Sequence, residues 1–260
     1  MHPCAGPRRA DSIGPGHRPD AAAVAPPPSI GAVTRELANA YWPDIESGTV
    51  TVAVPVGAFE QHGPHLPLDT DTRIAVAVAE ALPGVAVVPA VAYGASGEHE
   101  AFAGTVSIGA EALKTLIVEY GRSVCRWATR VVFVNGHGGN AYPLAEAVTL
   151  LRYEGRDAAW VACAIPGADA HAGDTETSLM LHLAPHTVNM GRATAGAKDP
   201  IGTLMPRLRE AGIVSVSANG VLGDPTSASA DRGADMFADL MDRATAQVAR
   251  WQPGKEGRLR

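Results

Sequence analysis

A twelve-residue stretch of the chain gathers side chains that can bind divalent metal ions. It contains Glu60, His62, His65, Asp69 and Asp71. Imidazole and carboxylate groups together suit zinc, iron and manganese. Glu60 and His62 are two residues apart, so at an extended strand end they point to the same side. Asp71 follows a bent loop that can fold back, which would let its carboxylate bridge two cations as aspartates do in dinuclear hydrolases.

The flanking sequence predicts where these side chains lie. The apolar run Val50–Val56 precedes them, and Pro64 and Pro67 exclude a helix. The candidate ligands should therefore occupy a stiffened loop at the end of a strand. Taken alone, the same residues would also fit a surface loop with a salt-bridged acid and solvated histidines. Two further clusters in the chain favour the metal site.

The second cluster is Asn135–Asn140, with the sequence Asn-Gly-His-Gly-Gly-Asn, and it follows the apolar run Val131–Val134. Its glycines let the backbone turn sharply and bring His137 towards the site. A phosphate-binding loop or a plain tight turn, ordered by Asn135 and Asn140, is the alternative. A phosphate loop would usually carry a lysine or a GxGxxG spacing, which this segment lacks.

The third cluster is His171–Ser178, which follows the apolar run Trp160–Ile165. Glu176 stands at the start of a predicted helix, where an acid either stabilises the helix dipole or binds a metal ion. In the second case His171 would serve as an acid/base or electrophile, and Asp174 is the weaker candidate. Three strand ends that each carry histidine or acid predict one site at one edge of a parallel sheet.

The remaining histidines and serines are weaker candidates. His99 ends the glycine-rich segment Gly94–His99 and could touch a substrate. His182 and His186 are one turn apart and are expected at the surface. No Gly-x-Ser-x-Gly elbow is present, which argues against a serine hydrolase.

The body of the chain alternates predicted strands and helices. Strands are predicted at 49–56, 85–90, 130–134 and 157–164, and helices at 72–82, 111–127, 140–154, 176–183, 206–211 and 231–251. This rhythm predicts an α/β fold with a mainly parallel sheet covered on both faces. Residues 31–260 should form one domain. Residues 1–30 are rich in Pro, Gly and Ala and are expected to be a disordered tail.

Composition narrows the classes of partner. The net charge is −6 and no basic run is visible, which argues against nucleic-acid binding. No apolar stretch reaches 18 residues, so no membrane-spanning helix is expected. Cys125 and Cys163 lie in apolar periodic segments and are expected to be reduced core residues of a cytoplasmic protein.

The three motifs together resemble the creatininase family of metal-dependent amidohydrolases. They are Glu60–Asp71, Asn135–Asn140 and His171–Ser178, and the resemblance runs from about Val50 to Trp251. It implies a three-layer α/β/α fold and a site for two divalent metal ions, with zinc, iron and manganese all compatible with nitrogen and oxygen ligands. It also implies a homo-oligomer, since relatives are commonly hexameric.

The resemblance also implies roles for individual residues. Glu60 would bind one metal and His62 the other, with Asp71 bridging them and His137 completing the first metal's ligands. The position matching Gly139 is a carboxylate ligand in creatininase itself, so the second metal lacks a ligand here.

Glu176 is the expected replacement for that carboxylate, either as a ligand or as a catalytic acid/base. His171 matches a residue near the substrate carbonyl. The tryptophans that close over creatinine in creatininase are missing from Ile165–Ala170. Creatinine is therefore not the expected substrate.

The expected activity is metal-assisted hydrolysis of an amide or peptide bond. Segments outside the metal motifs look most like a family branch that cleaves a small modified peptide; they are Tyr93–His99, Phe102–Gly109 and Gly220–Thr226. Hydrolysis of a small cyclic amide or formamide, as in other branches, is the rival. A non-catalytic scaffold with one structural metal is the remaining alternative, favoured by Gly139.

Overall fold

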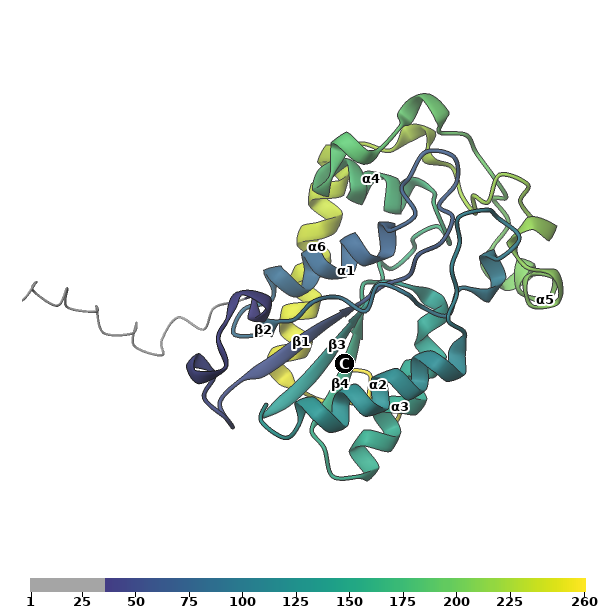
Figure 1. Ribbon diagram of the computed structural model, residues 1–260. Helices are drawn as coiled ribbons and strands as arrows, with labels where there is room; N and C mark the ends of the chain where they lie inside the picture. The colour runs from purple at the N-terminus through teal and green to yellow at the C-terminus, as the bar shows by residue number, and fades with distance from the viewer. Residues whose placement is uncertain (1–35) are drawn as a thin grey trace, which may run out of the picture. The chain divides into compact units, whose positions relative to one another are not determined.

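A four-stranded sheet, in which every neighbouring pair of strands runs parallel, forms the centre of the protein (Figure 1). The structure is a computed structural model and describes residues 36–260, so the predicted tail lies outside the described residues. The strand order is β2-β1-β3-β4, with bounds β1 (Thr51–Val56), β2 (Ala86–Val87), β3 (Arg130–Asn135) and β4 (Ala158–Ala162). The predicted parallel sheet is confirmed.

Six α-helices accompany these strands in the described part of the chain, and the longest of them cover the two faces of the sheet (Figure 1). Their bounds are α1 (Thr70–Ala81), α2 (Ala110–Val124), α3 (Ala141–Tyr153), α4 (Asp174–Leu183), α5 (Ile201–Ala211) and α6 (Ala230–Arg250). None of the helices within residues 36–260 is both long enough and apolar enough to cross a membrane.

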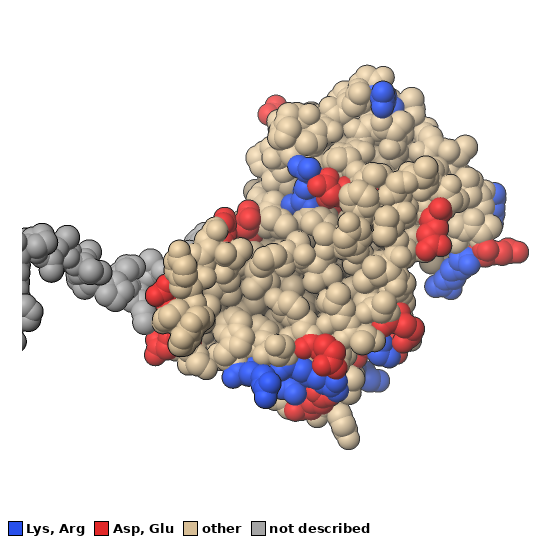
Figure 2. All heavy atoms as spheres, viewed as in Figure 1, with Lys and Arg blue, Asp and Glu red and all other residues tan. Residues whose placement is uncertain are grey.

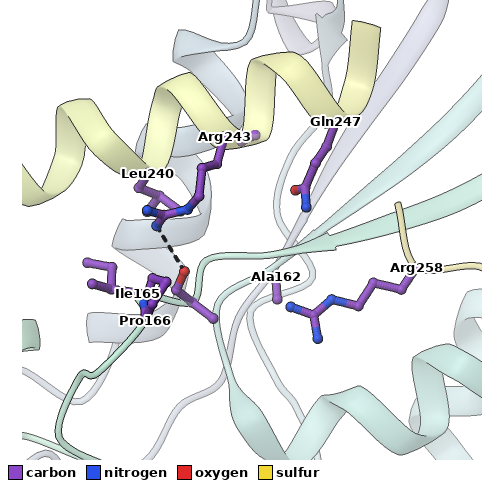
Figure 3. Close-up of a pocket in the computed structure, with 9 residues that line it drawn as sticks. Ala162, Ile165, Pro166, Leu240, Arg243, Gln247 and Arg258 are labelled. Atoms are coloured by element: carbon purple, nitrogen blue, oxygen red, sulfur yellow. Dashed lines mark hydrogen bonds between the residues drawn. The ribbon is translucent and has the colours of Figure 1, made fainter. Parts of the chain in front are cut away.

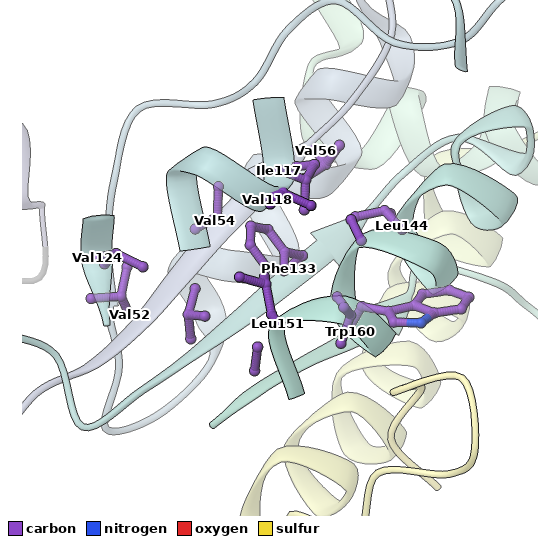
Figure 4. Packing of buried hydrophobic residues seen from close by; sticks show 14 of the residues in the cluster. Val52, Val54, Val56, Ile117, Val118, Val124, Phe133, Leu144, Leu151 and Trp160 are labelled. Atoms are coloured by element: carbon purple, nitrogen blue, oxygen red, sulfur yellow. The ribbon is translucent and has the colours of Figure 1, made fainter. Parts of the chain in front are cut away.

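One face of the sheet packs against α2 and α3. Val52 and Val54 of β1 and Phe133 of β3 point to this side, where they join Ile117 of α2 and Leu144 of α3 in one buried cluster (Figure 4). All five side chains are fully buried. Successive strand residues face opposite sides of a sheet, so this alternation assigns every second strand residue to this layer.

The other face packs against α1 and α6. Ala53 and Val132, which alternate with the residues of the first cluster, lie here with Val78 of α1 and Leu240 of α6. Helices on both faces of a parallel sheet make three layers, as predicted. Because both faces of the sheet are buried, the strand sequences are nearly continuous apolar runs.

Two elements differ in length from the sequence prediction by several residues. Strand β2 has only two residues, whereas six were predicted. The N–H of Val88 still donates to the carbonyl of Ala53, but Pro55, the next residue of β1 on this side, has no N–H to donate in return, so the ladder ends there. Helix α5 begins at Ile201, not at Pro206, which lies inside it. That proline is tolerated because the carbonyl it leaves without a partner, that of Gly202, belongs to an exposed residue.

Charged side chains of both signs are interspersed on the face of the molecule shown in Figure 2. Two ion pairs join α2 to α3. The ammonium of Lys114 lies 2.8 Å from a carboxylate oxygen of Glu146, and Arg122 contacts Glu154. These groups face solvent, which screens each pair, so neither pair contributes much to stability.

Candidate metal centre

Three loops at one edge of the sheet bring their polar side chains together. Val56 and Asn135 are register partners at the ends of β1 and β3, so the chain leaves both strands at the same edge. Glu60 follows β1, and His137 follows β3. Because the carboxyl ends of parallel strands share one edge, residues far apart in sequence meet there.

Asp71 lies between two imidazoles from different loops. Its Oδ1 is 3.2 Å from Nε2 of His62, and its Oδ2 is 3.4 Å from Nδ1 of His137. The same nitrogen of His137 is 3.2 Å from Oε1 of Glu60. Asp71 stands in the first turn of α1, which begins at Thr70, and not in the preceding loop. All four side chains are buried.

Glu176 approaches the cluster from the first turn of α4. Its Oε2 accepts a hydrogen bond from the backbone N–H of Ala172 at 2.6 Å. The same oxygen lies 3.8 Å from Nε2 of His62 and 4.0 Å from Nδ1 of His171. Asp174 is not part of the cluster, because it pairs with Arg232 near the surface.

His99 is a member of the cluster that the sequence patterns did not place there. It ends a short 3-10 turn, is 2 % exposed, and holds its Nε2 atom 3.2 Å from Oε1 of Glu60. A usable signal existed in the chain, since the Glu98-His99 pair also follows a predicted strand. Gln61, which contacts His99 and His171, was missed because glutamine carries no metal-binding signature.

The buried carboxylates lack partners that would satisfy them. Both oxygens of Glu60 and the Oδ2 atom of Asp71 are buried without a hydrogen bond. Burial raises the pKa of Glu60 to about 8. Burial opposes protonation of His62, yet the carboxylates of Asp71, Glu176 and Glu60 raise its pKa to about 10. Such shifts and unsatisfied oxygens are typical of a functional site that holds a cation.

Three overlapping groups of side chains bring their ligand atoms within 4.8 Å of one another. They are Glu60, His62 and Asp71, then His62, His171 and Glu176, and then Glu60, His99 and His171. Nitrogen and oxygen ligands in this number fit borderline divalent cations. The residues present therefore fit the metal ions that the family resemblance implies.

Comparison with known families agrees with this arrangement. The sequence profile of the creatininase family, described as creatinine amidohydrolase, matches residues 38–248. That range includes the sheet and every residue of the cluster. The chain belongs to the creatininase family. The predicted class, a hydrolase acting on C–N amide bonds, is confirmed at this level.

Named relatives show which members of the creatininase family this chain resembles. The chain is 56 % identical over 217 residues to a mycofactocin precursor peptide peptidase of Mycolicibacterium smegmatis, covering 80 % of this chain and 88 % of the relative. It is 52 % identical over 240 residues to the same-named protein of Mycobacterium tuberculosis, covering 87 % and 96 %. Identity to a creatinine amidohydrolase of Pseudomonas putida is 31 %, over 58 % of this chain and 71 % of that protein. The predicted likeness to a peptide-cleaving branch is confirmed.

Solved structures of the creatininase family share the fold. The structure of creatininase Mn superposes with a TM-score of 0.73 at 26 % identity, covering 84 % of this chain and 99 % of that one. A mutant creatininase of the Zn-Zn type gives 0.71 at 24 % identity, covering 86 % and 100 %. The α/β architecture predicted from the sequence is therefore that of the family.

Gly139 has no room for a side chain in this structure. A Cβ atom at this position would lie 2.4 Å from both the carbonyl oxygen of Ala95 and Nε2 of His137. It would also lie 3.0 Å from Oε1 of Glu98. Glu98 thus occupies this side of His137, whereas Glu176 faces His62. Of the two carboxylates, Glu176 is the one placed to complete a second cation site.

A separate cavity of about 330 Å³ lies between α6 and the end of β4 (Figure 3). Ala162, Pro166, Arg243 and Gln247 help to line it, and Arg243 donates a hydrogen bond to the carbonyl of Ala164 at 3.2 Å. None of its lining residues belongs to the carboxylate and imidazole cluster. The metal centre is therefore a distinct feature of the fold.

Proposed function

We propose that the protein is a metal-dependent peptidase that cleaves the modified mycofactocin precursor peptide and releases its C-terminal Val-Tyr-derived core. The proposed substrate rests on sequence identity. The chain is 51 to 56 % identical, over at least 80 % of its length, to proteins named mycofactocin precursor peptide peptidase. The buried cluster at the sheet edge supports the chemistry. The reaction would be one step in making a redox cofactor.

Two divalent cations would be held by the clustered side chains. Glu60 and His137 would hold one cation and His62 and Glu176 the other, and Asp71 contacts an imidazole of each pair. Zinc, iron and manganese all suit these ligands. Bound there, such ions supply Lewis acidity to an amide carbonyl and make water a nucleophile near neutral pH.

His171 is the residue we assign to proton transfer. Burial lowers its pKa well below the usual range, so the imidazole is neutral at rest. Its Nδ1 faces the carboxylates of Glu60 and Glu176 at 3.9 and 4.0 Å. It can take a proton from the attacking water and pass it to the leaving nitrogen. Glu176 remains the alternative acid/base if it proves not to be a ligand.

Hydrolysis of a small cyclic amide or formamide is the second candidate. It is favoured by the 31 % identity to a creatinine amidohydrolase and by the shared fold. A scaffold with one structural metal would need no turnover at all.

One experiment distinguishes peptide cleavage, small-amide hydrolysis and a non-catalytic scaffold. Metal-loaded protein is incubated in parallel with the cyclised precursor peptide, creatinine and a formamide, and products are identified by mass spectrometry. Release of the C-terminal core from the peptide alone supports the proposal. Turnover of a small amide without peptide cleavage supports the second candidate, and no turnover with one metal per chain supports the scaffold.

We further propose a homo-oligomer, hexameric as in relatives, that works in the cytoplasm. Trp42 and Tyr41 are 85 % and 77 % exposed, which suits aromatic side chains at an interface. Cys125 and Cys163 are both free thiols, as a reducing compartment would keep them. Sedimentation analysis tests the assembly, and a mass of one chain contradicts it.

A further inference from the structure

The side chain of Gln61 is buried between two of the proposed ligands, and its orientation is fixed by backbone groups. It is 5 % exposed. Its Oε1 accepts a hydrogen bond from the N–H of Gly63 at 2.9 Å, and its Nε2 donates to the carbonyl of Gly220 at 3.1 Å. A flipped amide would set donor against donor at Gly63 and acceptor against acceptor at Gly220. Only one orientation satisfies both.

This orientation decides where His99 carries its proton. The second N–H of the Gln61 amide meets Nδ1 of His99 at 2.9 Å. That ring nitrogen must accept, so the proton of the imidazole is on Nε2. Nε2 lies 3.2 Å from Oε1 of Glu60. His99 therefore turns an N–H towards that carboxylate, without a hydrogen bond between them, and has no bare nitrogen facing the cluster.

The backbone of Gln61 makes His171 turn its other ring nitrogen, Nδ1, towards the cluster. The Nε2 atom of His171 lies 2.8 Å from the carbonyl oxygen of Gln61, which can only accept. His171 therefore carries its proton on Nε2, and its Nδ1 is bare. The 3.1 Å approach of the Gln61 amide nitrogen to the same Nε2 is a contact between donors, because both amide hydrogens are already engaged. The bare Nδ1 points at Glu60 and Glu176.

We propose that Gln61 is a positioning residue that presents His99 and His171 to the cluster in opposite ways. His99 turns its Nε2–H towards Glu60, and His171 alone of the two offers a bare nitrogen to a cation or a proton. Of the three groups that could hold a cation, the one containing His99 is then not a metal site. The part of this inference that concerns cations rests on the proposed function, whereas the proton positions hold for the metal-free protein.

Gly220 makes this arrangement possible from a distant part of the chain. Its φ is +79°, a conformation that suits glycine, and a Cβ there would lie 1.9 Å from Oε1 of Gln61. The segment Gly220–Thr226 lies outside the metal motifs. Part of its function here is to leave room for the Gln61 amide and to accept its hydrogen bond.

Solid-state 15N NMR of metal-free protein labelled at the histidine rings tests the proton positions directly, since protonated and bare ring nitrogens resonate far apart. His99 is assigned as the ring lost in His99→Gln. The expected spectrum shows His99 and His171 both protonated on Nε2, with His99 Nδ1 shifted by its bond to an amide donor. A proton on Nδ1 of either ring overturns the proposal, whatever the metal content of the protein.

Gln61→Glu tests the cause. A carboxylate at this position accepts instead of donating, so the proton of His99 should move to Nδ1 while the signals of His65 stay unchanged. Gln247→Glu is the matched control, because it makes the same chemical change beside the cavity of Figure 3 and should leave His99 as in the parent. An unchanged His99 in folded Gln61→Glu overturns the proposal. The parent spectrum remains decisive if that variant does not fold.

Metal binding provides a readout independent of turnover. In His99→Gln the amide N–H stands near the position of Nε2, so an N–H still faces Glu60 and the variant should bind zinc with the parent's stoichiometry. His99→Ala should weaken zinc binding by about 10- to 100-fold, the usual effect of losing a partner of a ligand. Equal losses in both variants would make His99 a ligand and overturn the proposal. A parent protein that binds no zinc would instead contradict the proposed function, leaving the NMR result standing.

Discussion

Asp71 places one carboxylate oxygen 3.2 Å from Nε2 of His62, and both side chains are almost completely shut off from solvent. Its other oxygen faces His137, which comes from a different strand end. One carboxylate thus contacts imidazoles on two loops, which supports the proposal that Asp71 is a ligand shared by two cations.

We expect Asp71→Asn to lose both cations and to lower turnover by at least about 100-fold. Removing a ligand shared by both cations should cost more metal affinity than removing a residue that only hydrogen-bonds to a ligand. Metal content after dialysis and hydrolysis of the peptide measure the effect. Asp69→Asn is the control, since that partly exposed carboxylate pairs with Arg73 and should leave both quantities unchanged. Two metals retained per chain in Asp71→Asn would contradict the shared role.

Glu176→Gln should reduce metal occupancy from two ions towards one. The reason is its position beside His62, where no side chain from residue 139 can contribute. Metal analysis and turnover are measured on the same sample. If turnover falls while both ions stay bound, Glu176 is an acid/base and not a ligand.

Metal uptake should release protons near neutral pH. In the metal-free protein burial raises the pKa of Glu60 to about 8, and neighbouring carboxylates, against the effect of burial, raise that of His62 to about 10. Both groups are then protonated at pH 7 and must lose their protons to act as ligands. Affinity should therefore rise as the pH increases from 7 through 8.

Calorimetric titration with zinc in buffers of different ionisation enthalpy counts the protons released. The number should fall in Glu60→Gln, which has no proton to lose at that position. Zinc affinity that is unchanged or decreases between pH 7 and 8 would show that these groups are already deprotonated in the metal-free protein.

Phe133→Ala should lower the free energy of unfolding by about 3 to 5 kcal/mol, the range for removing a buried aromatic ring. Phe133 is fully buried between β3 and the α2–α3 layer. Tyr153→Ala is the control, because that side chain is 88 % exposed and its loss should change stability by less than about 0.5 kcal/mol. Chemical denaturation compares the two, and similar losses would contradict the assigned packing.

The sheet could be predicted because its strands are apolar on both faces. Apolar runs such as Val131–Val134 can be recognised as strands from the local sequence alone. The short β2 could not be predicted from the same pattern, because Pro55, which has no N–H to donate, becomes its neighbour only in the folded sheet. The start of α5 was missed because the exposure of Gly202, which makes Pro206 tolerable there, is a property of the folded chain.

The cluster could be predicted only in part. His62, His137 and Glu176 belong to motifs that each contain their own chemical signal, and the structure brings them together. The place of His99 depends on how a glycine-flanked turn packs onto Glu60. The orientation of Gln61 depends on a glycine 159 residues away in sequence, which no local pattern can reveal.

Adding a single methyl group at Gly139 tests how closely the His137 loop is packed. In Gly139→Ala the new Cβ would meet the Ala95 carbonyl and His137 Nε2 at 2.4 Å, so the imidazole must shift from its position beside Glu60 and Asp71. Metal affinity should fall by about tenfold or more, as when a ligand loses its support. Gly138→Ala is the matched control, since nothing lies within 4 Å of its Cβ position. Zinc titration of both variants decides the matter, and equal affinities would mean that the loop at Gly139 relaxes without disturbing His137.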